Sequence, residues 1–444
     1  MKVFVGIDLG STTTKAVVLD EDGVVLGRGI TNSRSNYDLA AEVARTEAFV
    51  SARFDLLRRE VEATAGREAL DRLLSAFRLE QRRAQLGLLR ERVETEARLS
   101  ESADEGRALL DALGVLFDRI EAEEEERFES GDAGERSDFF RDAVGSAYAR
   151  IAEELVCPPG ADRTVNAGVK ARGGAGRTPN GVTFDRLMGL YDKSIVAVEN
   201  QRIELGFRDH IGPALFRIGD PREVREGVSR ALALEIVVAG QVGTGYGRAR
   251  LPFPKEQIRS EILCHGLGAH VMFPATRTVL DIGGQDTKAI QVDEQGIVTS
   301  FQMNDRCAAG CGRYLGYIAD EMNVGLHELG PIALAGKRPV RITSTCTVFA
   351  GAELRERIAL GERREDILAG LHRAVILRAM SLLARSGGIE EEFSFTGGVA
   401  RNPAAVAALE RLVYENYGTR RINISPESIY TGALGAAHFA RRAA

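Results

Sequence analysis

Two segments far apart in this chain of 444 residues repeat one another. Residues 8–25 read DLGSTTTKAVVLDEDGVV, and residues 281–298 read DIGGQDTKAIQVDEQGIV. Aligned without a gap, the two copies share these pairs: Asp8/Asp281, Gly10/Gly283, Thr14/Thr287, Lys15/Lys288, Ala16/Ala289, Asp20/Asp293, Glu21/Glu294 and Gly23/Gly296. In each copy an apolar strand ends in an acidic, glycine-rich turn, a second strand follows, and a DG or QG turn leads to a third. The repeat predicts that each half of a two-lobed protein opens with a three-stranded meander.

The turn after the first strand of each copy carries groups that suit a phosphate. Glycines let backbone N–H groups approach an anion closely, and neighbouring hydroxyls add donors. An aspartate at the end of the strand can hold a hydrated Mg²⁺ or orient a water. Either turn alone could be an ordinary tight hairpin with surface charges. The duplication instead favours a clamp that holds the phosphates of a nucleotide from both sides.

A third segment completes the pattern. Residues 393–413, FSFTGGVARNPAAVAALERLV, predict a strand, a Gly-Gly turn and an amphipathic helix. Gly397 and Gly398 would let the chain lie flat against a purine and its ribose.

These three segments resemble the two phosphate loops and the adenosine motif of the sugar kinase, Hsp70 and actin ATPase superfamily. The resemblance implies an α/β protein with the two-lobed ATPase fold of that superfamily. It also implies that Asp8 supports Mg²⁺, that Asp281 positions the attacking water, and that Gln285 assists catalysis. The residues expected to bind ATP are Gly10, Ser11, Thr12, Thr13, Lys15, Gly283, Gly284, Asp286, Thr287, Lys288, Gly397 and Gly398.

The five cysteines are odd in number and scattered, so they do not indicate a disulfide framework. Cys307 and Cys346 each precede a helical pattern, and a helix N-terminus favours anionic sulfur. Neither has the nearby CxxC partner of a mononuclear zinc site, but two ligands from each of two chains can make a Cys₄ iron–sulfur site. Cys311 could replace Cys307 as the ligand, and two buried packing cysteines are the remaining alternative.

The sequence around these cysteines sharpens the resemblance. DRCAAGCGRYL and STCTVFAGAEL, with TGYGR at 244–248 and SEILCHGLGA at 260–269, resemble the ATP-dependent activators of 2-hydroxyacyl-CoA dehydratases and the ATPase subunits of benzoyl-CoA reductase. In that family, two ATPase subunits share one [4Fe-4S] cluster through two cysteines each, and ATP hydrolysis moves helices so that an electron passes on at low potential. The resemblance covers residues 1–40 and 240–444, and it implies ATP, Mg²⁺ and a cluster held by Cys307 and Cys346.

The middle of the chain departs from the short activators and predicts a large, mainly helical insertion in the first lobe. Leucines recur at intervals of three and four residues from FDLLRREV onward, with arginine and glutamate on the other face. The acidic stretch 121–138 predicts an exposed segment or loop, and the glycine- and arginine-rich stretch 168–181 predicts a loop. The expected division is 1–44 for the start of the first lobe, 45–235 for the insertion, 236–280 for the rest of that lobe, and 281–444 for the second lobe.

An insertion of this kind resembles the large ATPase subunit of the ATP-dependent benzoyl-CoA reductase. That resemblance implies reduction of the aromatic ring to a cyclic dienoyl-CoA, with ferredoxin as the electron donor. The implied partners are a second, shorter ATPase subunit and catalytic subunits that bind the acyl-CoA. The alternatives are a homodimeric activator of a 2-hydroxyacyl-CoA dehydratase, a small-molecule kinase of the same superfamily, and an actin-like filament protein.

Charge and hydropathy limit the setting. A net charge of −6 argues against nucleic acid as the main partner. We expect no signal peptide at the first residues, and no stretch that approaches the roughly 18 apolar residues of a membrane span. The expectation is a cytoplasmic protein that acts away from membranes.

Overall fold

The computed structural model describes residues 1–33, 36–100, 102–130, 140–156, 181–245, 251–305, 311–343 and 347–444. The chain forms two compact units. Unit 1 comprises Met1–Ser33, Ala40–Ala48 and Ile236–Ala444, and unit 2 comprises Arg34–Leu39 and Phe49–Glu235. Both copies of the repeat lie in unit 1.

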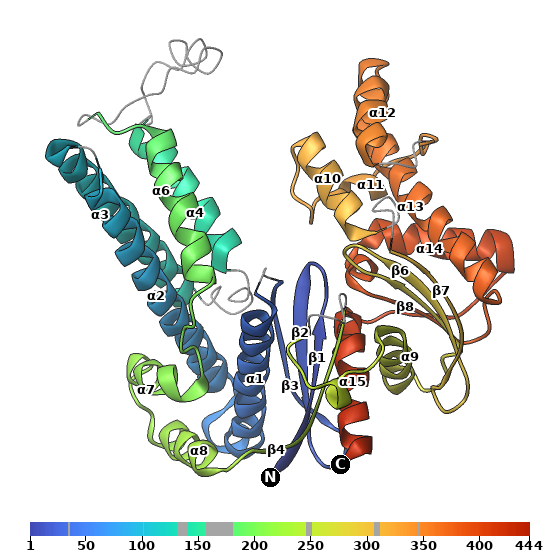
Figure 1. Ribbon diagram of the computed structural model, residues 1–444, viewed down its shortest axis with the longest axis horizontal. Helices are drawn as coiled ribbons and strands as arrows, with labels where there is room; N and C mark the ends of the chain where they lie inside the picture. The colour runs from blue at the N-terminus through green and yellow to red at the C-terminus, as the bar shows by residue number, and fades with distance from the viewer. Residues whose placement is uncertain are drawn as a thin grey trace. The chain divides into compact units, whose positions relative to one another are not determined.

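Unit 1 contains two sheets, each built around one copy of the repeat (Figure 1). The first has the order β3-β2-β1-β4 and consists of β1 (Lys2–Leu9), β2 (Thr13–Leu19), β3 (Val25–Asn32) and β4 (Val237–Gly245). The second has the order β7-β6-β5-β8-β9 and consists of β5 (Thr278–Ile282), β6 (Thr287–Val292), β7 (Val298–Asn304), β8 (Phe393–Thr396) and β9 (Ile422–Asn423). In each sheet the three strands of the repeat are antiparallel, and a later strand joins the first one in parallel. The two predicted meanders and the two-lobed α/β architecture are confirmed.

The two copies agree in register as well as in strand order. Asp8 pairs with Lys15 across β1 and β2, and Asp281 pairs with Lys288 across β5 and β6. The next turn also repeats, because an aspartate side chain closes it by accepting two backbone N–H groups. These bonds run to Asp20 from Asp22 and Val24, and to Asp293 from Gln295 and Ile297. The shared aspartate and glycine of the sequence repeat therefore specify the same turn twice.

Helices cover the faces of both sheets. α15 (Thr431–Ala443) packs on the first sheet, and α9 (Glu261–Met272) lies between α15 and the second sheet (Figure 1). α13 (Arg364–Ser386), with α14 (Pro403–Tyr417) beside it, covers the opposite face of the second sheet. Side chains of α9 meet Val279 and Ile290, whereas those of α13 meet Leu280 and Ile282, as the alternation of a strand requires.

α9 and α15 touch backbone to backbone. A Cβ atom at Gly268 would lie 1.9 Å from the carbonyl oxygen of Thr431, and one at Gly435 would lie 1.9 Å from that of Cys264. Only glycine allows an approach this close at either position.

α13 corrects one expectation about apolar stretches. It contains an 18-residue window with a mean hydropathy of 1.5, so by length and composition alone it could cross a membrane. However, 61% of that window is buried inside the protein. Its apolar residues belong to the core that it shares with the second sheet, so α13 is a core helix of the second lobe.

The other elements of unit 1 are short helices that connect these layers. They are η4 (Lys255–Gln257), α10 (Gly312–Met322), α11 (Leu329–Leu334), α12 (Thr347–Ala359), η6 (Gly398–Arg401) and η7 (Pro426–Tyr430).

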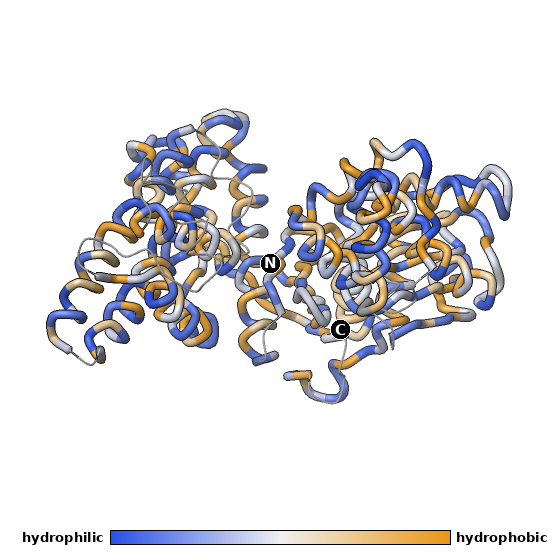
Figure 2. The backbone as a smooth tube through the Cα atoms, turned by 90° about the horizontal axis from the view of Figure 1, so that it is seen from above, coloured by the Kyte–Doolittle hydropathy of each residue, from blue (hydrophilic) through white to orange (hydrophobic). Residues whose placement is uncertain are grey.

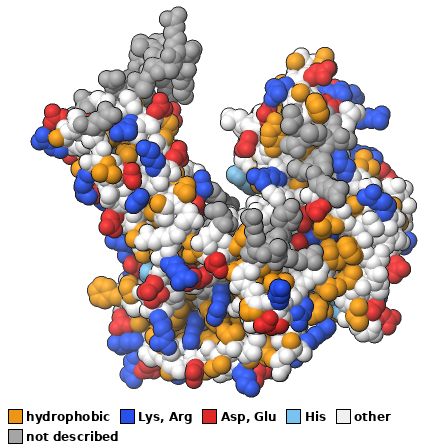
Figure 3. All heavy atoms as spheres, in the orientation of Figure 1, with side chains coloured by type: hydrophobic (Ala, Val, Ile, Leu, Met, Phe, Trp, Pro, Cys, Tyr) orange, Lys and Arg blue, Asp and Glu red, His pale blue; other side chains and the backbone are white. Residues whose placement is uncertain are grey.

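The regular elements in the described residues of unit 2 are all helices, as was expected of the insertion. Its helices are α1 (Tyr37–Ala65), of which Ala40–Ala48 belong to unit 1, α2 (Arg67–Arg98), α3 (Ala103–Glu129), α4 (Phe140–Val156), α6 (Phe184–Glu199), α7 (Phe207–Arg217) and α8 (Arg222–Ala233). Figure 2 shows hydrophilic and hydrophobic residues alternating along them, which is the amphipathic pattern of a bundle. Figure 3 shows acidic and basic side chains mixed on the exposed face.

Two details of unit 2 differ from the sequence analysis. The leucine-rich pattern breaks at Gly66, whose φ of +80° ends α1 and precedes α2. The acidic stretch continues α3 as far as Glu129, and residues 131–139 lie outside the described part of the chain. Glu124 is buried rather than exposed because Arg82 binds its Oε2 at 2.6 Å. The stretch 168–180 also lies outside the described residues.

Candidate functional site

The turns that follow β1 and β5 meet one another. A Cβ atom at Gly284 would lie 2.1 Å from Oγ1 of Thr12 and 3.7 Å from Oγ of Ser11. The first turn is braced by Ser33, whose Oγ donates to the carbonyl oxygen of Gly10 at 2.6 Å. The backbone of one predicted phosphate loop therefore faces the hydroxyl groups of the other.

The two lysines of the repeat have different surroundings. Lys15 is partly exposed, and a Cβ atom at Gly10 would lie 3.3 Å from its Nζ, so its ammonium group stands at the first turn. Lys288 is 1% exposed, and its Nζ lies 2.7 Å from Oδ2 of Asp286 and 2.8 Å from Oε1 of Glu261. The ammonium group of Lys288 is thus bound to carboxylates, whereas that of Lys15 lies at the first turn, so the two equivalent lysines of the repeat have different partners.

The other predicted residues of the two turns, including Gln285 of the predicted catalytic set, lie where the strands end. Gly10, Ser11, Thr13, Gly283, Gly284 and Gln285 are half-buried, Thr12 is exposed, and Asp286 and Thr287 are buried.

The two aspartates of the repeat lie near the ends of β1 and β5, and both are buried. Asp281 is held firmly, because its Oδ2 accepts a hydrogen bond from Oγ1 of Thr396 at 2.8 Å and lies 3.3 Å from Nδ1 of His265. Asp8 is held less firmly. Its Oδ1 is buried and has no hydrogen-bond partner within the described part of the chain.

This unpartnered oxygen fits the predicted support of Mg²⁺ by Asp8. Mg²⁺ is usually bound by one or two carboxylates, and waters and substrate phosphates complete the octahedron. Among the described residues, no group of three or more His, Cys, Asp or Glu side chains could hold a metal ion by itself. The donor set therefore suits an ion that arrives with the nucleotide.

The two aspartates and Lys288 form a buried polar centre with two residues of α9, Glu261 and His265. The sequence did not lead us to predict these two residues. They lie one turn apart on α9, and both are buried. Nε2 of His265 is 3.9 Å from Oδ2 of Asp8, and its Nδ1 faces Asp281. The available signal was the spacing of glutamate and histidine by four residues in SEILCHG, which places both on one face of a helix.

The charges of this centre shift one another's protonation. Burial by itself raises the pKa of Asp281, but the charges of His265 and Lys288 outweigh it and hold that pKa below the usual range. Burial lowers the pKa of Lys288, yet the surrounding carboxylates, Asp281 first among them, leave it well above the usual value. The pKa of Glu261 is raised, mainly by burial. Asp281 and Lys288 are therefore both charged over the physiological range of pH.

The predicted adenosine motif is confirmed as a strand, a turn and a helix: β8, Gly397 and η6, then α14, which Asn402 caps. Gly397 has a φ of +86°, and a Cβ atom there would lie 2.4 Å from the carbonyl oxygen of Ile282. Gly398 is exposed, and a Cβ atom there would meet nothing within 4 Å. Gly397 thus serves the fold, whereas Gly398 borders open space.

The predicted cluster ligands, Cys307 and Cys346, lie outside the described residues. The helix expected after Cys307 begins at Gly312, with Cys311 as its N-cap. Cys311 is 1% exposed and packs in the core of the second lobe. Cys264 is also buried, which raises the pKa of its thiol to about 12.

α10 is hydrogen-bonded to the turn between β5 and β6, which is the second predicted phosphate loop and is called the second phosphate turn below. The backbone N–H of Gly312 donates to the carbonyl oxygen of Gly283 at 2.9 Å, and that of Arg313 donates to the carbonyl oxygen of Gly284 at 2.7 Å. These two bonds couple the beginning of the helix to the turn that precedes β6.

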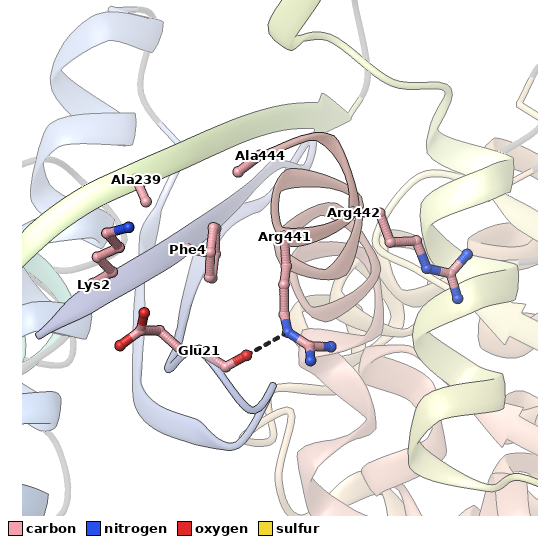
Figure 4. A pocket seen from close by; sticks show the side chains of 7 residues that line it. All are labelled: Lys2, Phe4, Glu21, Ala239, Arg441, Arg442 and Ala444. Atoms are coloured by element: carbon pink, nitrogen blue, oxygen red, sulfur yellow. Dashed lines mark hydrogen bonds between the residues drawn. The ribbon is translucent and has the colours of Figure 1, made fainter.

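A surface pocket of about 670 Å³ lies at the other end of β1 (Figure 4). Its lining residues are Lys2, Phe4, Glu21, Ala239, Arg441, Arg442 and Ala444. Nε of Arg441 donates to the carbonyl oxygen of Glu21 at 2.9 Å, while Arg442 points away on the far side of α15. None of the predicted site residues lines this pocket, so it is separate from the turns.

Comparisons with known proteins identify relatives of this chain. The chain is 41% identical over 226 residues to the (R)-2-hydroxyglutaryl-CoA dehydratase activating ATPase of Acidaminococcus fermentans, a match that covers 51% of this chain and 84% of that protein. It is 31% identical over 173 residues to one subunit of the benzoyl-CoA reductase of Thauera aromatica, covering 39% of this chain and 61% of that protein.

The fold is similar to that of a solved relative. The activator of the 2-hydroxyisocaproyl-CoA dehydratase from Clostridium difficile, solved with bound ADPNP, superposes with a TM-score of 0.50 at 22% identity, covering 99% of this chain and 95% of that one. The sequence profile of the BadF/BadG/BcrA/BcrD ATPase family matches residues 5–440. Because this match runs along almost the whole length of the chain, the chain belongs to the BadF/BadG/BcrA/BcrD ATPase family.

Proposed function

We propose that this chain is an ATP-hydrolysing, electron-activating subunit that passes electrons at low potential to a partner enzyme acting on an acyl-CoA. The observation that carries the proposal is the pair of hydrogen bonds from Gly312 and Arg313 to the second phosphate turn. They connect the nucleotide site to the helix that follows the segment containing Cys307. A change at the phosphates therefore has a direct route to the predicted ligand.

The residues of the centre divide the chemistry of ATP hydrolysis. Lys15 and the N–H groups of both turns would hold the phosphates, and Asp8 would support Mg²⁺ with its unpartnered oxygen. Asp281, oriented by Thr396, would position the attacking water, with Gln285 beside it. Catalysis of phosphoryl transfer is mostly positioning and charge stabilisation, so fixed groups of this kind are what the reaction needs.

Cys307 and Cys346 are the cysteines that would bind the iron–sulfur cluster. Each would contribute a thiolate to a [4Fe-4S] cluster shared with a second ATPase subunit, and the cluster would supply one-electron transfer. The helices that follow them are fastened together, because Arg355 of α12 forms an ion pair with Glu321 of α10. Within α10, Oη of Tyr317 donates to the same carboxylate of Glu321 at 3.0 Å, which helps to orient it toward Arg355. The two cysteine segments thus lead into one connected pair of helices.

The client enzyme belongs to one of two classes. An activator of a 2-hydroxyacyl-CoA dehydratase is supported by the 41% identity to a protein of that function, which extends over 84% of its length. A benzoyl-CoA reductase is supported by the 31% identity to a subunit of such an enzyme. The large helical insertion, which forms unit 2, also supports it. The comparisons favour the dehydratase class, and ring reduction is the second candidate.

The remaining parts of the proposal follow from this chemistry. Ferredoxin would donate the electron, catalytic subunits would bind the acyl-CoA, and the whole assembly would act in the cytoplasm. The second ATPase subunit is either another copy of this chain or a shorter relative. Unit 2 would then be the insertion that docks one of these partners.

The test measures iron and acid-labile sulfide on protein purified without oxygen, with co-purifying subunits retained. We expect about two irons per ATPase chain after clusters on other subunits are subtracted. Cys307→Ser and Cys346→Ser should each lose this iron but still bind ATP, while the buried Cys264→Ala should keep it. Wild-type protein without iron under these conditions would contradict the proposal and favour a small-molecule kinase instead.

A second measurement separates the two clients. The intact complex is supplied with ATP and reduced ferredoxin, together with either a 2-hydroxyacyl-CoA or benzoyl-CoA. Loss of water from the 2-hydroxyacyl-CoA supports the dehydratase class. Formation of the cyclic dienoyl-CoA supports ring reduction.

A further inference from the structure

One face of α9 is polar although it is buried. Glu261 and His265 are 8% and 7% exposed, respectively, and the rest of the helix is rich in apolar and small residues. Burying such groups is unfavourable unless partners compensate them. In this protein Lys288 is the partner of Glu261, and the two aspartates of the repeat are the partners of His265.

The imidazole of His265 stands between the two aspartates of the repeat. Nδ1 lies 3.3 Å from Oδ2 of Asp281, and Nε2 lies 3.9 Å from Oδ2 of Asp8. The first distance allows a hydrogen bond from Nδ1–H to the carboxylate, whereas the second is an electrostatic contact without one. A single side chain from outside the repeat thus contacts both lobes.

The surroundings of the two aspartates break the symmetry of the repeat. Thr396 and Thr244 occupy matching positions, since each pairs with an aspartate across a parallel strand. Thr396 donates its hydroxyl hydrogen to Asp281, but Thr244 donates to the carbonyl oxygen of Arg259 instead. Asp281 is therefore fixed on two sides, and Asp8 keeps one oxygen without a partner among the described residues.

Room for this arrangement comes from a glycine of α15. A Cβ atom at Gly432 would lie 2.7 Å from Oδ2 of Asp8 and 2.8 Å from Nε2 of His265. The φ of Gly432 does not require glycine, since it lies outside the left-handed range. The close contact with the aspartate and the imidazole is what excludes a larger residue there.

We propose that His265 is a positioning residue for ATP hydrolysis, which holds Asp281 by its Nδ1–H and sets the spacing of Asp281 from Asp8. The inference rests on the proposed function of these aspartates. In that role His265 acts through Asp281 and touches neither the nucleotide nor the attacking water. Its removal should slow the chemical step and leave the binding of ATP nearly unchanged, because the phosphate turns and Gly398 do not depend on it.

The test compares four variants in the intact protein with its co-purifying subunits. His265→Ala should lower kcat by about 10- to 100-fold, the usual effect of a misplaced catalytic group, while KM for ATP changes by less than about threefold. His265→Asn should recover most of kcat, since its amide nitrogen takes the place of Nδ1 and can donate to Asp281. His265→Gln, whose amide reaches the place of Nε2, should recover much less. His270→Gln, on the same helix near the turn at Gly296, is the matched control and should behave as wild type.

Gly432→Ala gives an independent check, because its methyl group would displace the imidazole and Asp8 without changing either residue. It should also lower kcat more than it raises KM. Wild-type kcat in His265→Ala would overturn the inference. Equal loss of kcat in His265→Asn and His265→Gln, with lower thermal midpoints for both, would show a purely structural role. Wild-type protein that neither binds nor hydrolyses ATP would refute the proposed function, and with it this inference.

Discussion

The backbone N–H of Gly312, the first residue of α10, donates a hydrogen bond of 2.9 Å to the carbonyl oxygen of Gly283. Gly283 belongs to the second phosphate turn, and Gly312 begins a helix of the second lobe. The bond joins two segments that the sequence separates by a strand pair and a cysteine-containing stretch. It makes the position of the helix a function of the conformation of the turn.

Proline at position 312 tests this connection. The first position of a helix tolerates proline, and the extended backbone of Cys311 suits the residue before it. The ring would replace the N–H hydrogen and push the carbonyl of Gly283 away, so Gly312→Pro should weaken ATP binding by about tenfold, the effect of one lost hydrogen bond. Ala103→Pro, at the first position of α3, should leave ATP binding unchanged. Equal ATP affinities in a calorimetric titration of wild type and Gly312→Pro would show that α10 does not hold the turn.

The two glycines of the adenosine motif should respond differently to alanine. Gly397→Ala places a Cβ atom against the backbone of Ile282 and strains a positive φ, so it should cost about 2–4 kcal/mol of unfolding free energy. Gly398→Ala should change stability by less than about 0.5 kcal/mol, since its methyl group enters open space. If adenosine occupies that space, Gly398→Ala weakens ATP binding. Denaturant unfolding and ATP titration of both variants separate the two effects.

Removing one member of the buried ion pair between Arg82 and Glu124 in unit 2 should destabilise the protein more than replacing both members. Glu124→Ala removes the carboxylate that pairs with the buried guanidinium of Arg82 at 2.6 Å and should destabilise the protein by about 3–5 kcal/mol. Replacing both residues, as in Arg82→Met with Glu124→Leu, should restore most of that loss. Urea unfolding followed by helical circular dichroism measures both. A double variant as unstable as Glu124→Ala would show that the site cannot repack with apolar side chains.

Stability should fall in mild acid through His438 of α15. Burial, together with the positive charges of Arg441 and Arg442, lowers the pKa of this imidazole to about 4. Between that value and the unfolded pKa near 6.5, the unfolded chain binds a proton that the folded chain does not, so stability decreases as pH falls through this window. The full shift is reduced by partial exposure, so the loss should be about 1–2 kcal/mol.

His438→Gln removes the imidazole that takes up this proton. The unfolding free energy of the variant should therefore depend less on pH between about pH 6.5 and pH 4. The measurement is chemical unfolding of wild type and variant across that range. Parallel pH profiles for the two proteins would show that His438 does not titrate as its surroundings require.

The repeat made much of unit 1 predictable, because its residues specify local turns. The aspartate and glycine of each DG or QG turn act within a few residues, so both meanders could be inferred from the order of the residues. The glycines at 397 and 398 likewise marked the end of a strand. The break between α1 and α2 at Gly66 was not predicted, because a positive φ divides the two helices and the spacing of the leucines does not reveal it.

The polar centre was only partly predictable, because its partners come from distant parts of the chain. Lys288 matched Lys15 in the repeat and was expected to bind phosphate in the same way, yet α9 brings Glu261 to it. Glu261 and His265 lie within a mostly apolar helix that is not part of the repeat. Their contacts depend on how α9 packs between the sheets, which no local pattern records.

The glycine contact between α9 and α15 has a mechanical consequence. At Gly268 and Gly435 the two helices touch through bare backbone, with no side chain at these two points to separate them, so the crossing can serve as a pivot. Gly432 puts Asp8 and His265 beside this axis, where a rotation displaces atoms least. Points far from an axis travel the longest arcs. A small turn of one lobe would therefore keep the two aspartates in register while it carried the outer ends of α10 and α12 through a much larger sweep.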